Sequence, residues 1–263
     1  MMNNSDERMI ALERELEAMR VRCRKVETAL QEEREARQAF VSLVTHELRV
    51  PMTSIKGYTD LLLKGIMGPV NESQHSFLET IRANVERMSR MVADLSDINK
   101  IEGDRLKIAL EPVEVEPAVE EAVASIREAS EDKSQILQVS LPSSLPPVRC
   151  DRARFIQVLK NVLRNAVQYT PEGGAIDVVV NAENDALKVA VQDDGIGILE
   201  DEQDRIFEQF FRASDEETRK TPGNGLALHL SRQLLALQDG HIGFESERGM
   251  GSSFYFTLPL ARD

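Results

Sequence analysis

The chain has no tryptophan, an aromatic content of only 5%, and two cysteines among its 263 residues. The cysteines, Cys23 and Cys150, are too few and too far apart for a disulfide framework or a paired-thiol metal site, which favours a reducing, cytoplasmic setting. Basic residues are also in deficit, since 32 Lys and Arg face 45 Asp and Glu and the net charge is -13. Such an acidic chain is a poor candidate for binding nucleic acid or anionic lipid, because attraction to phosphate needs clustered Lys and Arg.

Long apolar runs are missing as well. No segment approaches the roughly 18 apolar residues of a transmembrane helix, so we expect no direct membrane insertion. The start of the chain is polar and acidic, unlike a secretory signal peptide. Hydrophobic residues still make up 41% of the chain and charged residues 29%, as in a globular protein with long exposed helices.

A heptad pattern lies near the N-terminus. Apolar residues recur there in alternating steps of three and four, at Met9, Leu12, Leu16, Met19, Cys23, Val26 and Leu30. The pattern predicts a coiled coil over residues 1–36, and a parallel homodimer is the simplest source of the partner helix. The register weakens where Glu33 and Arg37 take core positions. This stretch is either an imperfect coiled coil or a joint through which a helix shift can pass.

A helical hairpin is predicted over residues 37–103. Its first helix runs from Phe40 to Leu62 and stops at GIMGPVNES, which contains two glycines and a proline. Asn71 then starts a second helix as its N-cap, with Gln74 three residues later as in a capping box. Two such hairpins from two chains would form a four-helix bundle.

The pattern changes after EGD at residues 102–104, which looks like a hinge. Strand-like runs follow, namely LKIAL, ILQVSL, AIDVVVNA, ALKVAVQD and GSSFYFTLPL. Helical segments lie between them, near residues 116–130, 151–169 and 224–238. This alternation predicts a mixed α/β domain over residues 104–263, so the expected fold class of the whole chain is α+β and multidomain.

The stretch VTHELRVPM, residues 44–52, places a His-Glu pair about one turn before a proline. His46 is two positions from the apolar Leu48, so it points to roughly the opposite side of the helix. A free imidazole is a nucleophile or proton carrier near neutral pH, and Glu47 can take the proton from one ring nitrogen. Pro51 removes a backbone hydrogen bond and crowds the carbonyl of Glu47, which predicts a bend. For an isolated histidine, a solvated surface position would be the alternative.

Two motifs in the second half of the chain carry polar side chains. In QVLKNVLRNAVQYTPEGG, the amides of Asn161, Asn165 and Gln168 share one helix face, where they can bind a cation or phosphate. A solvent-exposed polar face is a fair alternative for them. In VAVQDDGIGI, a strand ends at Asp193, whose carboxylate can accept a hydrogen bond from an amino group such as that of adenine.

Glycines and a long segment complete the set of motifs. Backbone amides beside glycines can approach phosphate closely, and the candidates here are Gly195, Gly197, Gly223 and Gly225. The segment IFEQFFRASDEETRKTP lies between the two glycine pairs, and loops of this length are often functional. Its candidates for anchoring the segment are Phe207, Phe210 and Phe211. Its candidates for reaching phosphates are Arg212, Arg219 and Lys220.

These motifs together resemble the sensor histidine kinases of two-component systems. FVSLVTHELRVPMTSIKGY resembles the H box, QVLKNVLRNAVQYTP the N box, DDGIGI the first glycine box, IFEQFF the F box, GNGLAL the second glycine box and GMGSSFYFTLP the last one. All occur in family order and spacing over roughly residues 37–260. The resemblance implies a dimerisation and phosphotransfer hairpin followed by a Bergerat-type α/β sandwich that binds ATP.

The resemblance also implies roles for individual residues. His46 matches the phosphoacceptor and Glu47 its acid–base partner. Asn165 matches the Mg²⁺ ligand, with Asn161 nearby as a second possibility, and Asp193 matches the carboxylate that reads adenine. The implied ATP-binding set is Asn161, Asn165, Tyr169, Asp193, Gly195, Gly197, Phe207, Arg212, Gly223, Gly225, Leu226 and Ser252.

The function implied by this resemblance is ATP-dependent autophosphorylation on His46, with ATP and Mg²⁺. The phosphoryl group would then pass to an aspartate in the receiver domain of a separate response regulator. The kinase would be a cytoplasmic homodimer that takes its input from an unknown upstream sensor or input protein.

Three residues depart from the family pattern. Val50 stands where the family usually has Thr or Asn, and its inability to hydrogen-bond predicts weak phosphatase activity. Gln168 replaces a usual Lys or Arg, and Ala227 replaces a usual glycine. These two leave an alternative, a degenerate kinase that acts as a dimeric nucleotide-binding signalling scaffold. A chaperone-like ATPase is a third possibility, and the His-Glu-Pro hairpin argues against it.

Overall fold

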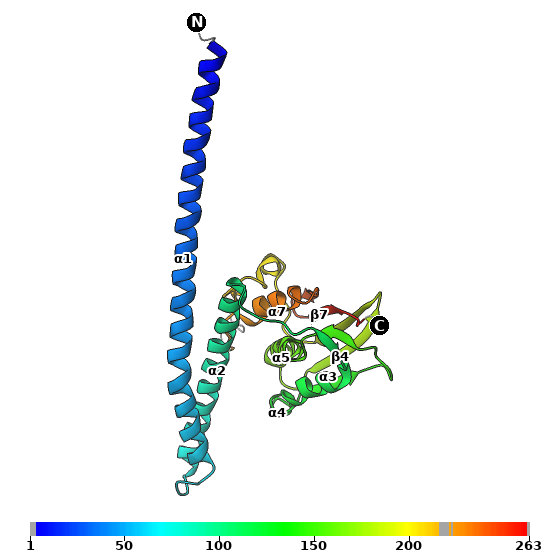
Figure 1. Cartoon of the computed structure of the whole chain (residues 1–263). Coiled ribbons are helices and arrows are strands. Elements are labelled where there is room, and N and C mark those ends of the chain that lie inside the picture. Colours follow the sequence, from blue (N-terminus) through cyan, green and yellow to red (C-terminus); the bar gives the residue numbers. More distant parts are fainter. Residues whose placement is uncertain (1–3, 216–220, 222, 262–263) are drawn as a thin grey trace. The chain divides into compact units, whose positions relative to one another are not determined.

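The structure, a computed structural model, describes residues 4–215, 221 and 223–261, and it describes side chains from Glu17 onward apart from Ala18 and Val21. The chain divides into two compact units, Met1–Arg105 and Leu106–Asp263. The first is a pair of long helices and the second is a mixed α/β domain (Figure 1). The α+β fold class predicted from the sequence is confirmed.

The helical unit consists of α1 (Asn4–Leu63) and α2 (Glu72–Glu102), which pack along each other. Met52 of α1 and Val85 and Val92 of α2 form a buried apolar cluster between them. The turn before α2 carries the predicted capping box. Asn71 Oδ1 accepts from the backbone N–H of Gln74, and Gln74 Oε1 accepts from the backbone N–H of Asn71, each at 2.9 Å. Two backbone N–H groups at the start of α2 are therefore hydrogen-bonded to side chains of the same turn.

The weak stretch of the heptad pattern coincides with the point where α1 meets the end of α2. Arg37 Nη2 lies 3.0 Å from Glu102 Oε2, and the buried Asn99 donates a hydrogen bond of 3.0 Å to the carbonyl of Gln38. Arg37 thus occupies a predicted core position and binds the C-terminal turn of α2 instead. The ion pair with Glu102 gives this polar residue a partner within the hairpin.

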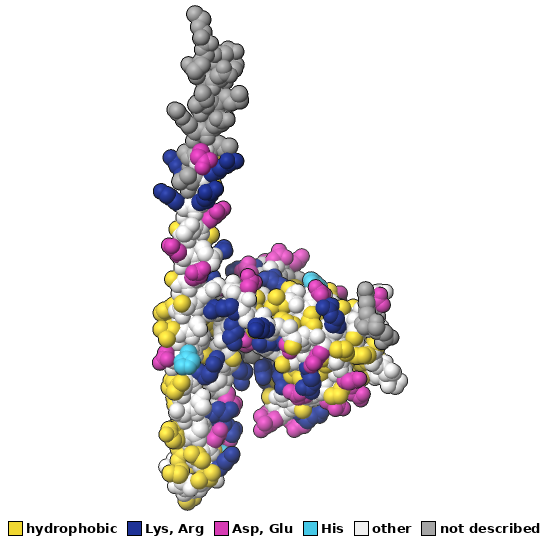
Figure 2. Space-filling model, viewed as in Figure 1, with side chains coloured by type: hydrophobic (Ala, Val, Ile, Leu, Met, Phe, Trp, Pro, Cys, Tyr) yellow, Lys and Arg dark blue, Asp and Glu magenta, His cyan; other side chains and the backbone are white. Residues whose placement is uncertain are grey.

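Many apolar side chains of the helical unit are exposed, and Figure 2 shows them along the visible side of α1 and at the hairpin turn. They include Met19, Val26, Leu30, Phe40, Leu43, Ile55, Phe77 and Met88. A row of exposed large apolar side chains on this scale marks an interaction surface. Within the described ranges, neither helix is apolar over a long enough stretch to cross a membrane.

The second unit is built on a five-stranded sheet with the order β2-β4-β5-β7-β6. Strand β2 pairs parallel to β4, and the other neighbours are antiparallel. The strands of this sheet are β2 (Ile136–Ser140), β4 (Ala175–Glu183), β5 (Ala186–Asp193), β6 (His241–Glu247) and β7 (Gly251–Pro259). A short antiparallel pair, formed by β1 (Glu111–Val113) and β3 (Val148–Cys150), adjoins the end of β7, where Val148 bridges Leu260.

Helices cover one face of the sheet (Figure 1). They are α3 (Val115–Ala124), α4 (Arg127–Asp132), α5 (Arg152–Tyr169) and α7 (Ala227–Ala236), with a 3-10 helix, η1 (Glu200–Arg205), before the long segment. Alternate residues of β4, such as Ile176 and Val178, are buried against the helices, as expected for a half-buried strand. Phe155 of α5 meets Phe256 of β7 edge-on, with 5.7 Å between ring centroids. This core fixes α5 over the strand ends that carry the site.

Three details of the predicted element pattern were wrong. LKIAL, residues 106–110, forms no strand, because the backbone N–H of Ala109 bonds the side chain of Asp151 rather than a neighbouring strand. The predicted helix over 116–130 is two helices, α3 and α4. The strands β1, β3 and β6 were missed, the first two because each has only three residues.

The two cysteines take no part in a disulfide. Cys23 is exposed on α1, and Cys150 is fully buried in β3. Burial raises the pKa of the Cys150 thiol to about 12, with Asp151 and Glu111 adding to the effect. Its thiol is therefore a small apolar core group rather than a nucleophile.

Candidate functional site

The predicted phosphoacceptor lies on the exposed surface of α1. His46 Nδ1 is 3.2 Å from Glu47 Oε1, and the two side chains are 69% and 70% exposed. The N–H of Nδ1 can donate to the carboxylate, which leaves the lone pair of Nε2 free and pointing to solvent. The preceding residue, Thr45, is buried and donates to the carbonyl of Ser42. Thr45 therefore lies on the buried side of α1 and His46 on its solvent-exposed side, as the spacing of the apolar residues predicted.

A second His-Glu pair in the same unit serves as a comparison. On α2, His75 Nδ1 lies 3.6 Å from Glu79 Oε2, and both side chains are about half exposed. This distance is longer than a hydrogen bond. Only the pair of His46 and Glu47 combines high exposure with hydrogen-bond contact among the histidines that the structure describes in the helical unit.

Pro51 lies inside α1, and the helix continues through it. Because proline has no N–H, the Glu47 carbonyl lacks its usual donor four residues later. One turn on, Ser54 Oγ donates to the carbonyl of Val50. The Val50 side chain is 60% exposed and offers no hydrogen-bonding group beside His46.

In the α/β unit, Asp193 lies at the end of β5 opposite Ser252 of β7. Its Oδ1 accepts a hydrogen bond of 3.0 Å from the backbone N–H of Gly195. Burial raises the pKa of Asp193 from 3.8 to about 6, although the backbone N–H groups of Gly195 and Ser252 act in the opposite direction. A carboxylate in this position is a strong acceptor whose charge is poorly solvated. It is suited to binding a donor such as an exocyclic amino group.

The loop after β5 needs glycine for two different reasons. A Cβ on Gly195 would lie 2.6 Å from Asp193 Oδ1 and 2.7 Å from the carbonyl oxygen of Tyr169, so a side chain there would displace the site. Gly197 has φ +64, and a Cβ on it would lie 2.0 Å from the carbonyl oxygen of Glu247. The loop therefore passes between α5 and the β6–β7 turn with no room for a side chain at Gly195 or Gly197.

The amide face of α5 is only partly as predicted. Asn161 is buried, and its Nδ2 lies 3.2 Å from Ser231 Oγ and 3.4 Å from the carbonyl oxygen of Ala227 on α7. A solvent-exposed polar face is therefore wrong for Asn161, whose side chain joins two helices. Asn165 is one turn further on and half-buried. Its side chain is the more accessible of the two.

Arg212 and the end of α5 meet at one corner of the site. Burial raises the pKa of Tyr169, while the nearby Arg212 and Gln168, which hydrogen-bond with it, act in the opposite direction. A Cβ on Gly223 would lie 3.5 Å from Arg212 Nε and 3.7 Å from Gln168 Nε2. Arg212 also donates to the carbonyl of Thr221. The corner where Gln168 stands in place of a cation thus holds the guanidinium of Arg212.

The long segment after η1 is anchored by one of its three phenylalanines. Phe207 packs edge-on against Phe244 of β6 at 6.0 Å, and its carbonyl contacts His229 Nδ1 at 3.0 Å. Phe211 lies under the guanidinium of Arg205, whereas Phe210 is 62% exposed and was wrongly predicted as an anchor. The other basic candidates, Arg219 and Lys220, lie outside the described residues.

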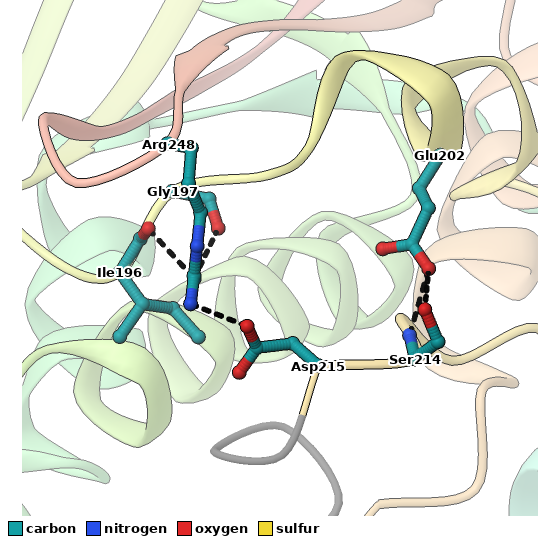
Figure 3. A network of polar contacts seen from close by, with 6 residues as sticks. All are labelled: Ile196, Gly197, Glu202, Ser214, Asp215 and Arg248. Atoms are coloured by element: carbon teal, nitrogen blue, oxygen red, sulfur yellow. Dashed lines mark hydrogen bonds and ion pairs between the residues drawn. The ribbon is translucent and has the colours of Figure 1, made fainter.

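Two polar contacts that the motifs did not predict, one a pair of hydrogen bonds and the other an ion pair, fix the described part of this segment (Figure 3). Glu202 Oε1 accepts from both the backbone N–H and the hydroxyl of Ser214. The guanidinium of Arg248 binds the carboxylate of Asp215.

Arg248 also ties the segment to the glycine loop. Its Nη1 donates to the carbonyl of Ile196 at 2.9 Å, and the carbonyl of Gly197 lies at 3.5 Å (Figure 3). Sequence reasoning missed these contacts, because Arg248 lies 33 residues from Asp215 and 52 from Ile196 and such distant contacts leave no local signal.

The remaining predicted residues lie around the same loops. Leu226 is buried just before α7, and the carbonyl of Gly225 accepts from the N–H of Phe210 at 3.0 Å. The hydroxyl of Ser252 is 2.9 Å from that of Ser246, which also accepts from the N–H of Ile198. Ser252 therefore supports the glycine loop from the β7 side.

The residues around the site fit a metal ion that is coordinated mainly by the phosphates of a bound ligand. Those that the structure describes do not form a metal site made of protein side chains alone. Among the described residues, no group of three or more His, Cys, Asp or Glu side chains could hold a metal. The half-buried amide of Asn165 offers a single neutral oxygen, the kind of ligand that Mg²⁺ accepts when phosphates and water supply the others.

Two family models match the chain. The family described as "His Kinase A (phospho-acceptor) domain" matches residues 36–104, and the one described as "Histidine kinase-, DNA gyrase B-, and HSP90-like ATPase" matches residues 150–262. Together they cover the hairpin with His46 and the part of the α/β unit from residue 150 onward, which contains Asp193.

Curated proteins with similar sequences include several sensor kinases. The sensor protein kinase WalK of Staphylococcus haemolyticus is 33% identical over 87% of this chain and 37% of its own length. The circadian input-output histidine kinase CikA of Synechococcus elongatus is 31% identical over 85% of this chain and 30% of its own length. The non-motile and phage-resistance protein of Caulobacter vibrioides is 29% identical over 98% of this chain and 30% of its own length. The chain spans about a third of the length of these relatives.

Solved structures agree in fold. Full-length ShkA in complex with AMPPNP has a TM-score of 0.68 and 25% identity, over 85% of this chain and 46% of that one. The histidine kinase AdeS of Acinetobacter baumannii has a TM-score of 0.59 and 24% identity, over 82% of this chain and 98% of that one. Because both family models match in order and relatives such as WalK are at least 30% identical over most of the chain, the chain belongs to the sensor histidine kinases.

Proposed function

We propose that the chain transfers the γ-phosphoryl group of ATP to His46 and then passes it to an aspartate on a separate response regulator. The observation that carries this proposal is the presence, in one chain, of an exposed His46 paired with Glu47 and a glycine-lined site with Asp193 at its base. The pair of His46 and Glu47 supplies a nucleophile with a proton acceptor beside it. The Asp193 site supplies an acceptor for an amino group, next to glycine backbone that a ligand can approach closely.

The chemistry needs only positioning and a proton acceptor. Nε2 of His46 would bond to the γ-phosphorus as the bond from that phosphorus to the bridging oxygen breaks, and ADP would leave with the electron pair. The positive charge that develops on the imidazole is relieved through Nδ1, which lies 3.2 Å from Glu47 Oε1. Glu47 can therefore stabilise the charged ring or accept its proton.

The nucleotide would be held by the loops of the α/β unit. Asp193 would accept from the adenine amino group, and Arg212, next to Gly223, would face the phosphates. A bound Mg²⁺ would neutralise phosphate charge, and the amide oxygen of Asn165 would hold it. The presence of Arg212 at the corner of Gln168 argues that this substitution does not remove all positive charge there.

A homodimer would account for the exposed apolar side chains of the helical unit. Phe40, Leu43 and Ile55 on α1 and Phe77 on α2 are each at least 45% exposed. Covering them with the same surface of a second chain would build the predicted four-helix bundle and continue into the coiled coil over residues 1–36.

Labelling with radioactive ATP and Mg²⁺ tests the proposal on the full chain, with His46→Gln as the variant. We expect acid-labile label on the wild type and none on the variant. ATP binding without any label on the wild type would instead support the alternative, a degenerate kinase serving as a nucleotide-binding scaffold. A wild type that does not bind ATP would contradict both.

Val50 should limit the dephosphorylation of the regulator. Its exposed apolar side chain cannot orient a water molecule for attack on a phosphorylated regulator. We expect slow release of phosphate from the regulator in the presence of ADP, and faster release with Val50→Thr. The matched control is Leu48→Thr on the same helix. Rapid release by the wild type would contradict the assignment.

A further inference from the structure

The last turn of α5 ends against a proline that cannot complete it. A helix leaves its final carbonyls without backbone N–H partners. Here the N–H of Thr170 bonds the carbonyl of Ala166, and the next residue, Pro171, has no N–H to give. Thr170 itself is extended, with φ -78 and ψ 132, as expected for a residue before proline. The carbonyls that follow Ala166 must find donors elsewhere in the fold.

Lys133, in the loop between α4 and β2, supplies three of these donors. Its Nζ lies 2.8 Å from the carbonyl oxygen of Val167. It also lies 3.1 Å from the carbonyl oxygens of Gln168 and Thr170. An ammonium group has three N–H bonds, and here each has a carbonyl partner. The positive charge also lies at the negative end of the helix macrodipole.

Gln135, two residues later, adds the amide donors. Its side chain is buried, and its Nε2 lies 2.8 Å from the carbonyl oxygen of Thr170 and 3.1 Å from that of Val167. The carbonyl oxygen of Pro171 lies at 3.3 Å. Two side chains from one short loop thus bind the end of α5.

The carbonyl of Tyr169 is bound from the other side. It accepts a hydrogen bond of 3.3 Å from the N–H of Ile196, in the loop that follows Asp193. The same oxygen would lie 2.7 Å from a Cβ on Gly195. The last turn of α5 therefore lies between the side chains of Lys133 and Gln135 on one side and the glycine loop on the other.

We propose that Lys133 and Gln135 are positioning residues for the nucleotide site, because they fix the turn of α5 on which the glycine loop of residues 193–197 rests. They touch no predicted ligand and act through Tyr169 and Ile196. The effect on nucleotide binding rests on the proposed function, whereas the effect on the glycine loop does not.

Hydrogen exchange measured by NMR on the full chain tests the positioning without any nucleotide. In Lys133→Met, we expect exchange of the Ile196 N–H to rise by about tenfold, because three charge-assisted hydrogen bonds on its supporting turn are lost. The matched control is Lys160→Met on α5, since Lys160 Nζ pairs with Glu121 at 3.5 Å and not with a backbone carbonyl. Lys133→Arg keeps the charge and should recover part of the protection.

ADP affinity of the same variants tests the consequence. We expect about tenfold weaker binding in Lys133→Met, near wild-type binding in Lys160→Met, and an intermediate value in Lys133→Arg. Gln135→Met serves as the second variant if Lys133→Met does not fold, with the same rise in Ile196 exchange expected.

Unchanged Ile196 exchange in Lys133→Met and Gln135→Met would overturn the proposal. So would a rise that is equal across β4, β5 and β7, because that pattern is a general loss of stability rather than a local one. A wild type that fails to bind ADP would remove the proposed function and still leave the exchange of Ile196 to decide whether these residues position the loop.

Discussion

Replacing Asp193 with Asn should make the α/β unit more stable and its nucleotide binding much weaker. Burial raises the pKa of Asp193 from 3.8 to about 6, so the folded unit holds this proton more tightly than the unfolded chain does. The stabilising contribution is present below pH 3.8 and is lost as the pH rises through 6. At neutral pH, the ionised carboxylate therefore destabilises the folded unit, and in the proposed function it is the acceptor for the nucleotide.

The size of the effect follows from the pKa values. A difference of about two pKa units corresponds to roughly 3 kcal/mol. Solvent reaches the half-buried side chain, and an amide offers one acceptor oxygen to the N–H groups of Gly195 and Ser252 where the carboxylate offers two, so we expect about 1 kcal/mol for Asp193→Asn at pH 7.5. The gain should shrink to a small fraction near pH 4, where the wild-type carboxyl is protonated in the folded state and about 40% protonated in the unfolded chain.

Hydrogen exchange of the β5 and β7 amides in the full chain measures this difference, because these strands lie in the middle of the sheet and open only with the whole unit. The reasoning would be refuted if Asp193→Asn were less stable than the wild type at pH 7.5. It would also be refuted if the substitution changed the free energy of unfolding by the same amount at pH 4 and at pH 7.5.

The same carboxylate should give nucleotide binding a pH dependence. Asp193 is about nine-tenths ionised at pH 7 and about one-tenth at pH 5, so ADP affinity of the wild type should fall by roughly tenfold between them. The affinity of Asp193→Asn should be at least about 30-fold weaker at pH 7, since the charged acceptor is gone, and flat with pH. A sloping profile in the variant would assign the titration to another group.

Four further substitutions give separable outcomes. Asn165→Ala should weaken ATP binding in the presence of Mg²⁺ by about tenfold and leave binding in EDTA unchanged, because the amide oxygen is proposed to act through the metal. Asn161→Ala should chiefly lower the melting temperature, because the Asn161 amide joins α5 to α7. Gly197→Ala should destabilise the α/β unit by more than about 2 kcal/mol in denaturant unfolding. The reason is that Gly197 has φ +64 and that the new Cβ would lie 2.0 Å from the Glu247 carbonyl oxygen. A smaller loss of stability would show that the loop can move. Asn71→Ala should reduce the stability of the helical hairpin by about 1 kcal/mol in thermal unfolding followed by circular dichroism, and no change would show that the capping box is redundant.

Local patterns in the sequence predicted much of the fold. The capping box of Asn71 and Gln74 and the alternation of β4 are encoded within a few neighbouring residues, and the structure contains both. Short strands such as β1 and β3 were missed because three residues carry too little periodicity to predict a strand. The exposure of His46 followed from its spacing to the apolar residues of one helix.

Contacts between distant segments could not be predicted in the same way. Arg248 and Asp215 are 33 residues apart, and nothing in either neighbourhood indicates the ion pair. Asn161 looked like part of an exposed polar face, yet α7 packs over it and makes it a buried link. Lys133 and Gln135 lie in a region of the chain that carries no motif, and their role depends on where α5 ends in the folded unit.

Mapping the phosphorylated residue tests the central claim most directly. The helical unit contains two described His-Glu pairs, with His46 and Glu47 at 3.2 Å and His75 and Glu79 at 3.6 Å, so the protein carries its own internal comparison. After incubation of the full chain with ATP and Mg²⁺, mass spectrometry at neutral pH should find phosphate on His46 and none on His75. Phosphate on His75, or labelling that persists in His46→Gln, would contradict the account.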